Sequence, residues 1–127
     1  AYEKTSPVKT YAETLYIEAQ MKAGQSIQLP NADERAVYIA KGKVKARTTE
    51  IDQYNMAVFD PKDGIILEAI EDSSIAIIGG ENIGPRFMEW NFISTTKERI
   101  EKAKKDWIEG NFPTIPEDNE EHIPLPE

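Results

Sequence analysis

The fold of this chain is decided by the stretch Gly79–Trp107, which reads GGENIGPRFMEWNFISTTKERIEKAKKDW. A glycine pair closes an apolar segment, and a short aromatic-rich segment follows it. Thr95 and Glu98 then have the spacing of a capping box, in which the threonine caps the helix and the glutamate bonds back to it. Gly110 supplies a stop, because glycine tolerates the left-handed conformation. The stretch therefore predicts one last strand and a capped helix, and it contains no catalytic motif.

The helix, expected over about residues 95–109, has one apolar stripe. Its members recur at helical spacing, and they are Ile100, Ala103, Trp107 and Ile108. A helix with a single apolar stripe buries that stripe against a neighbouring element. We therefore expect Trp107 to belong to the helix face that packs against the barrel. Residues 111–127 contain several prolines, which cannot continue a helix and predict an extended tail.

The residues before Gly79 predict many short strands. Thr14–Met21 alternates apolar and polar side chains, which is the pattern of a half-buried strand. Further short apolar segments lie at residues 36–40, 44–48, 56–59, 65–70 and 75–78. Gly42, between the first two of these, indicates a hairpin, and Asp60–Gly64 indicates a tight turn. Many short strands with frequent turns are typical of a sandwich or a barrel.

Composition indicates one soluble domain. The chain of 127 residues is long enough to bury a single core, and it has no apolar run near the ~20 residues that a membrane-spanning helix needs. It has no cysteine, so we expect a cytoplasmic protein without disulfides or thiolate metal sites. The net charge of −8 argues against contact with nucleic acid. Five of the 23 acids, and no Lys or Arg, lie from Pro113 onward, so the tail is acidic.

Few side chains in the sequence offer chemistry. His122 is the only histidine, which excludes a metal site built on imidazole ligands. Glu34 and Arg35 stand at the start of a predicted strand, where they could hold a ligand or form an ordinary surface pair. Trp90 and Trp107 could stack on a ligand, although aromatic residues in such positions more often belong to a core or an interface. The residues alone therefore predict no catalytic site and no metal site.

Two segments resemble the pirin family. Pro85–Glu127, PRFMEWNFISTTKERIEKAKKDWIEGNFPTIPEDNEEHIPLPE, is similar to the C-terminal end of these proteins, with a WNF strand, an ERIEQAK-like helix and a closing IPLPE. Ser6–Tyr11, SPVKTY, looks like the opening of the second cupin domain of that family. The resemblance implies an all-β fold, namely a single cupin-type antiparallel β-barrel of the RmlC-like jelly-roll kind, also called a double-stranded β-helix. The barrel would cover about residues 11–93 of one domain of residues 1–127, with the C-terminal helix outside it.

The resemblance also bears on metal binding. Pirins are typically two-cupin proteins that hold Fe(II) in the N-terminal domain, and that domain is not part of this sequence. The first cupin metal motif places its glutamate near Glu34 and Arg35 and two histidines at Gln28–Asn31, and the second motif places a histidine at Leu67. A lone carboxylate cannot retain a transition metal, so we expect no metal and no cofactor. Glu34, Arg35 and Leu67 are candidate ligand contacts at the mouth of the barrel.

The resemblance leaves three functions open. We favour a non-catalytic structural and interaction domain, which pairs with a pirin-type N-terminal cupin domain or forms a homodimer. The alternative is a single cupin barrel that binds a small molecule. An enzyme similar to quercetin dioxygenase, with its iron in a separate N-terminal domain, ranks third. Phe87, Met88, Trp90 and Phe92 place apolar side chains on both faces of the last strand, so we expect an aromatic interface and a homodimer built on it.

Overall fold

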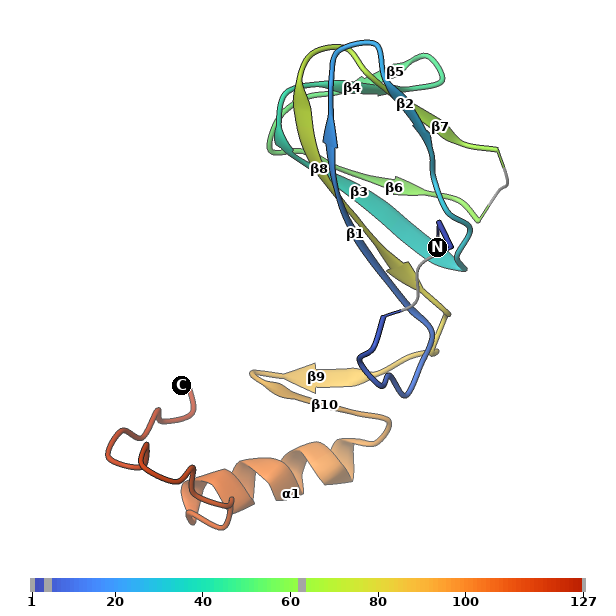
Figure 1. Cartoon of the computed structure of the whole chain (residues 1–127). Coiled ribbons are helices and arrows are strands. Elements are labelled where there is room, and N and C mark those ends of the chain that lie inside the picture. Colours follow the sequence, from blue (N-terminus) through green and yellow to red (C-terminus); the bar gives the residue numbers. More distant parts are fainter. Residues whose placement is uncertain (1, 4–5, 62–63, 127) are drawn as a thin grey trace. The chain divides into compact units, whose positions relative to one another are not determined.

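The computed structural model describes residues 2–3, 6–61 and 64–126. The chain divides into two compact units, Ala1–Ile83 and Gly84–Glu127. The first unit contains strands β1 to β8, and the second contains strands β9 and β10 with helix α1 (Figure 1). The boundary lies before residue 93, where we expected the barrel to end, because β9 and β10 have their main contacts with each other and with the helix.

Strands β1, β3, β6 and β8 form one antiparallel sheet of the first unit, which we call sheet A. Their bounds are Thr14–Met21, Glu34–Lys41, Met56–Phe59 and Ser73–Gly80. The spatial order is β1-β8-β3-β6, so the last strand of the unit lies inside the sheet. The predicted strand at Thr14–Met21 is confirmed, and every second side chain of β1 turns toward the core.

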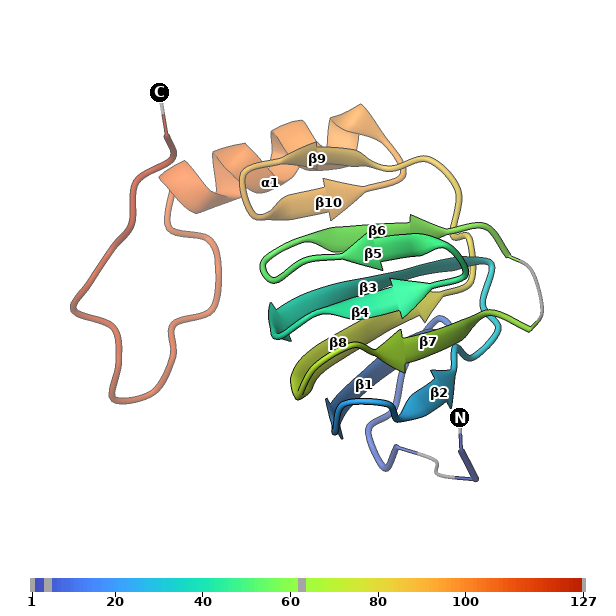
Figure 2. The ribbon, with the colours of Figure 1, turned by 90° about the horizontal axis from the view of Figure 1, so that it is seen from above.

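Strands β2, β4, β5 and β7 form the other antiparallel sheet of this unit, sheet B, which Figure 2 shows facing sheet A. Their bounds are Ser26–Gln28, Val44–Ala46, Thr49–Ile51 and Ile66–Ala69, and their order is β2-β7-β4-β5. β5 was not predicted, because its three residues carry only one apolar side chain. The turn predicted at Asp60–Gly64 lies partly outside the described residues.

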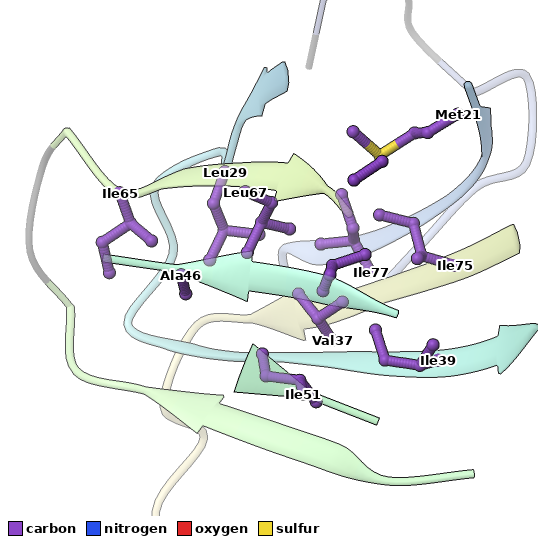
Figure 3. Packing of buried hydrophobic residues seen from close by; sticks show 12 residues of the cluster. Met21, Leu29, Val37, Ile39, Ala46, Ile51, Ile65, Leu67, Ile75 and Ile77 are labelled. Carbon is purple, nitrogen blue, oxygen red and sulfur yellow. The ribbon is translucent and has the colours of Figure 1, made fainter. Parts of the chain in front are cut away.

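Aliphatic side chains from both sheets fill the space between them (Figure 3). The buried members are Met21, Leu29, Val37, Ile39, Val44, Ala46, Ile51, Ile65, Leu67, Ala69, Ile75 and Ile77. Burying one such large side chain contributes roughly 1.5–3 kcal/mol. This interior is therefore the main source of stability of the first unit.

The fold prediction is confirmed in its main terms. The structure is mostly β, its sheets are antiparallel, and the described residues include one helix near the C-terminus. The expected barrel is not closed by hydrogen bonds, because the register pairs of the described strands form separate ladders for sheets A and B. A sandwich of facing sheets satisfies the same apolar and polar alternation as a closed barrel.

The hairpin predicted around Gly42 is wrong. β3 pairs with β6 and β8 in sheet A, whereas β4 pairs with β5 and β7 in sheet B. Gly42 therefore lies where the chain crosses from one sheet to the other. Its φ angle is +82°, and a Cβ atom added there would lie 2.6 Å from the carbonyl oxygen of Asp72. Glycine is needed at this crossing because of the left-handed conformation and because another part of the backbone approaches closely.

The second unit begins with a hairpin, so the prediction of one last strand is also wrong. β9 (Phe87–Glu89) and β10 (Phe92–Ser94) pair antiparallel, and Trp90 and Asn91 connect them. Trp90 has a φ angle of +50°, which bulky residues rarely adopt. The turn was missed because, although turns favour asparagine, Trp90 before it is a bulky apolar residue that is typical of a strand.

The predicted helix is confirmed as α1 (Lys97–Ile108), with a corrected start. Its N-cap is Thr96, whose hydroxyl accepts a hydrogen bond from the backbone N–H of Arg99 at 3.4 Å. The expected capping box, which began one residue earlier at Thr95, is therefore wrong. Gly110 has a φ angle of +71° and ends the helix as predicted. In the described part of the chain, no helix has the length and apolarity that a bilayer crossing requires.

Candidate functional site

A groove of about 580 Å³ lies at one end of sheet A, within the first unit. Glu34 and Arg35 both line it, so the structure brings together two of the three candidate ligand contacts. The groove also contains acids that the sequence did not single out as site residues, namely Glu13, Asp33, Asp60 and Glu81. Its walls therefore join the starts of β1 and β3 with the ends of β6 and β8.

Arg35 is held by the backbone and is hidden from solvent. Its side chain is 2% exposed. Nη1 donates hydrogen bonds to the carbonyl oxygen of Pro30 at 2.8 Å and to Oδ1 of Asn31 at 3.1 Å. Nη2 donates to the carbonyl oxygen of Asp60 at 3.0 Å. The guanidinium thus links the loop before β3 to the loop after β6. These hydrogen bonds offset the free-energy cost of burying a cation.

Glu34 lies on the exposed rim and helps to hold the loop after β8. Its Oε1 accepts a hydrogen bond from Nδ2 of Asn82 at 3.2 Å, and Oδ2 of Asp33 accepts from the backbone N–H of Asn82 at 3.2 Å. On the opposite side, Oε1 of Glu81 accepts from the backbone N–H of Glu13 at 3.3 Å. The loop is therefore bonded on both sides, and the groove is formed before any ligand arrives.

Leu67 lies in the core and not at a mouth of the fold. Its side chain is 0% exposed, and Leu29, within the segment where the family pattern places two histidines, is equally hidden. Both belong to the aliphatic cluster between the sheets. In the part of the chain that the structure describes, no group of three or more His, Cys, Asp or Glu side chains could hold a metal ion. The side chains of Leu29 and Leu67 contain no nitrogen, oxygen or sulfur atom, and a transition metal needs such atoms as ligands.

A second pocket, of about 440 Å³, opens between β5 and β6. These strands are edge strands of sheets B and A, so the sandwich is open along this side. The pocket reaches the core residues Ile51 and Ile65, and Arg47 lies on its lining with two threonines. This opening could not be predicted from the sequence, because it depends on which strands lie at the edges of the sheets.

The candidate interface residues of the second unit divide into two groups. Trp90 and Phe92 belong to an aromatic cluster with Trp107, in which the Trp90 and Trp107 ring centroids are 5.1 Å apart and those of Phe92 and Trp107 6.4 Å. Both pairs meet edge to face, an arrangement that aromatic rings favour. Phe87 and Met88, in contrast, are exposed. The cluster also stabilises the unusual backbone of Trp90, because its ring is packed where that conformation places it.

Trp107 connects the helix to the tail. Its Nε1 donates a hydrogen bond to the carbonyl oxygen of Ile123 at 2.8 Å, and the ring of His122 stacks on it with centroids 5.3 Å apart. Of the predicted apolar stripe, Ile100 is 4% exposed, but Ile108 is 70% exposed, so its assignment to the buried face is wrong. The stripe therefore includes buried Ile100 and half-buried Trp107 but not Ile108.

We expect Trp107→Ala to lower the free energy of unfolding of the second unit by about 2 kcal/mol, below the ~3–5 kcal/mol typical of fully buried tryptophan. The side chain is half-buried, so its removal loses ring contacts and the bond to the tail. Hydrogen exchange of the amides in residues 119–126 should rise together with the loss of stability. Ile108→Ala is the control and should change stability by less than about 0.5 kcal/mol. Equal exchange in both variants would contradict the role of Trp107.

Comparison with known sequences identifies relatives along the whole chain. The family described as the pirin C-terminal cupin domain matches residues 16–113. A pirin-like protein of Caulobacter vibrioides is 41% identical over 128 residues, which cover 100% of this chain and 44% of that protein. A putative quercetin 2,3-dioxygenase of Pseudomonas aeruginosa is 36% identical over 53 residues, which cover 41% of this chain and 17% of that protein. The chain thus spans less than half the length of these curated relatives.

Solved structures share the fold. A crystal structure of quercetin 2,3-dioxygenase from Acinetobacter baumannii matches 98% of this chain and 44% of its own with a TM-score of 0.81 at 21% identity. Another structure of quercetin 2,3-dioxygenase from that organism matches 88% of this chain and 41% of its own with a TM-score of 0.77 at 20% identity. At such identities the likeness concerns the jelly-roll arrangement of the strands and not the chemistry.

Proposed function

The chain belongs to the pirin family, as its C-terminal cupin domain, and from this premise we propose that it is a structural and interaction domain without a catalytic centre of its own. The observation that carries the proposal is the filled interior. Where the family pattern would place metal ligands, Leu29 and Leu67 are fully buried among aliphatic neighbours. The one buried charged group on the candidate site, Arg35, bonds to loop carbonyls.

The partner we propose is a cupin domain of the N-terminal pirin type. The pirin-like relative is more than twice as long as this chain, which covers 44% of it, so such a protein has room for a second domain. The hairpin of the second unit carries exposed apolar side chains on both faces. Met88 and Ile93 are paired in the register and are 73% and 63% exposed, and Phe87 on the opposite face is 42% exposed. Because exposed apolar patches on soluble domains often mark contact sites, this hairpin is the surface we assign to association. The lack of cysteine fits the cytoplasmic location that we propose.

A specific observation also favours a second function, the binding of a small apolar molecule. The pocket of about 440 Å³ between β5 and β6 has a volume in the range of ligand sites and leads to the core residues Ile51 and Ile65. Such a ligand would stabilise the sandwich where its edge is open. A rise in melting temperature with small apolar ligands, lost in Ile65→Ser, would support this alternative.

The absence of a metal centre is tested by elemental analysis of the purified chain. We expect less than about one tenth of an equivalent of iron, nickel, manganese or zinc after dialysis, since a lone carboxylate binds these ions weakly. Added Fe(II) should leave the denaturation midpoint unchanged, because a specifically bound ligand would raise it. A stoichiometric metal that survives dialysis, or a metal-dependent midpoint, would show that the proposal is wrong.

Association is tested by light scattering with the chain alone and with a pirin N-terminal cupin domain added in trans. We expect the chain alone to exceed the monomer mass of 14.4 kDa at micromolar concentration, and to form a one-to-one complex when the domain is added. The double variant Phe87→Ser, Met88→Ser should weaken both associations, while Ile108→Ser, an exposed change on the helix, should not. A 14.4 kDa species under every condition would contradict the interaction role.

A further inference from the structure

The outer face of sheet A carries a row of apolar side chains across its full width. The register aligns Tyr16 with Ile78, Ile78 with Ala36, and Ala36 with Val58. Tyr16 is 66% and Val58 80% exposed. In a soluble domain, single exposed apolar residues are common, whereas a continuous row over neighbouring strands indicates a contact surface. Ile78 is 37% exposed, whereas Ala36 in the middle of the row is 7% exposed, so the larger side chains of the row are the ones that reach solvent.

The row runs into the groove at the end of the sheet. Ala36, Val58 and Ile78 line the groove, which has a volume of about 580 Å³. Gly80 is the next outward position on β8, between Thr14 and Glu34 in the register. It has no side chain, and a Cβ atom there would lie 2.4 Å from the carbonyl oxygen of Glu13. The backbone of Glu13 therefore fills the space where a side chain at Gly80 would begin, and the apolar row meets the groove beside this point.

The charges around this groove indicate which partner fits. Its lining includes Glu13, Asp33, Glu34, Asp60 and Glu81. Among the described lining residues, Arg35 is the one cation, and its guanidinium is turned to loop carbonyls and hidden from solvent. The rim therefore carries a negative potential beside an apolar floor. Like charges disfavour a second copy of the same face, because a two-fold contact would bring acid against acid.

We propose that this face binds an extended segment of another protein in which lysine or arginine alternates with apolar residues. Side chains alternate in direction along an extended segment, so one set covers the row from Tyr16 to Val58 while the basic residues reach the acidic rim. Rim acids that already accept hydrogen bonds, such as Glu34 from Asn82 and Glu81 from Glu13, are fixed in place, which lowers the entropy lost on binding. This surface is separate from the hairpin assigned to association and does not depend on it.

The probe for this proposal is a fluorescein-labelled peptide of alternating leucine and lysine, with a leucine and glutamate peptide of equal length as its control. Binding to the 127-residue chain is measured by fluorescence anisotropy. We expect the basic peptide to bind and the acidic peptide not to bind. Affinity for the basic peptide should fall as salt is raised from ~0.05 to ~0.3 M, because exposed charge pairs are screened. Equal binding of both peptides would overturn the proposal.

Variants of the rim and of the row locate the site. Glu34→Gln with Glu81→Gln removes two charges but keeps both carbonyl acceptors, and we expect about a tenfold loss of affinity, given about two- to fivefold per exposed pair. Val58→Ser should lower the affinity for the basic peptide by a similar factor. Glu71→Gln, an exposed acid at the other end of β8, is the matched control and should bind as the parent does. Unchanged circular dichroism would show that the rim and row variants are folded. If these folded variants bind the basic peptide with the affinity of the parent, the proposed site is wrong.

Two further outcomes separate this inference from the proposed function. The Phe87→Ser, Met88→Ser variant should bind the basic peptide with parent affinity, because the hairpin is not part of the face. If Val58→Ser instead abolishes self-association while no peptide binds, the face is a contact between copies of this chain and the inference is wrong. Loss of association in the hairpin variant alone tests only the proposed function.

Discussion

Replacing Arg35 with methionine is expected to lower the free energy of unfolding by about 3–5 kcal/mol. Methionine fills much of the same volume but donates no hydrogen bond. The carbonyl oxygens of Pro30 and Asp60, which now accept from the guanidinium at 2.8 and 3.0 Å, would lose these donors. A hydrogen bond from a charged donor contributes about 1.5–3 kcal/mol. Two such bonds would be lost, and the two loops would also lose the link between them. Urea denaturation followed by tryptophan fluorescence and circular dichroism measures the change.

Two companion variants identify the cause of that loss. Arg35→Lys keeps the charge but not the planar fork of donors, so it should recover only part of the stability. Arg86→Met removes an exposed arginine and should change stability by less than about 0.5 kcal/mol. If Arg35→Met unfolds at the parent midpoint, the guanidinium does not hold the loops. If the lysine variant equals the parent, charge alone is sufficient and the fork geometry is not needed.

The second large effect is expected for Gly42→Ala, which should cost at least about 3 kcal/mol. The left-handed conformation alone costs a residue with a side chain about 1–2 kcal/mol. In addition, the new Cβ would lie 2.6 Å from the carbonyl oxygen of Asp72 and 2.9 Å from Cα of Ser73, so backbone atoms would have to move. The crossing between the sheets would be displaced, and with it the start of β4.

Gly24 is a matched control for this substitution. Its φ angle is also +82°, but an added Cβ would meet no atom within 4 Å. Gly24→Ala should therefore cost only the conformational part, about 1–2 kcal/mol. The difference between the two alanine variants in urea denaturation isolates the close approach of Gly42 to β8. Equal losses in both variants would show that conformation alone makes Gly42 necessary.

Much of the strand pattern could be predicted from the sequence, but the partners of the strands could not. β1 and β6 were predicted with their observed bounds, because alternation within a strand is a local property. The pairing of β3 and β4 was mispredicted, since a glycine between two apolar segments is equally compatible with a hairpin and with a crossing. Trp90 shows the same limit, because its ring packs against Trp107 on the helix, a contact that the local pattern does not reveal.

The candidate site was predicted in part for a similar reason. Glu34 and Arg35 were singled out by their place at the start of a strand, and both line the groove. Their different roles, one on the rim and one buried, depend on loop atoms that the local pattern does not reveal. The opposite wall was missed, because Glu13 and Glu81 meet across 68 positions of sequence. Leu67 was placed at a mouth by its position in a motif, whereas its apolar side chain belongs to the core.

The position of β8 determines when the first unit can fold during synthesis. β8 (Ser73–Gly80) is the last strand of this unit along the chain, yet β1 and β3 both pair with it. As the nascent chain leaves the ribosome, β1 and β3 have no neighbour to bridge them until Gly80 has emerged. Folding that waits for distant partners is slow, in the millisecond to second range for such β topologies, and unpaired strand edges invite aggregation meanwhile. The order of strands thus keeps sheet A incomplete until translation has passed β8.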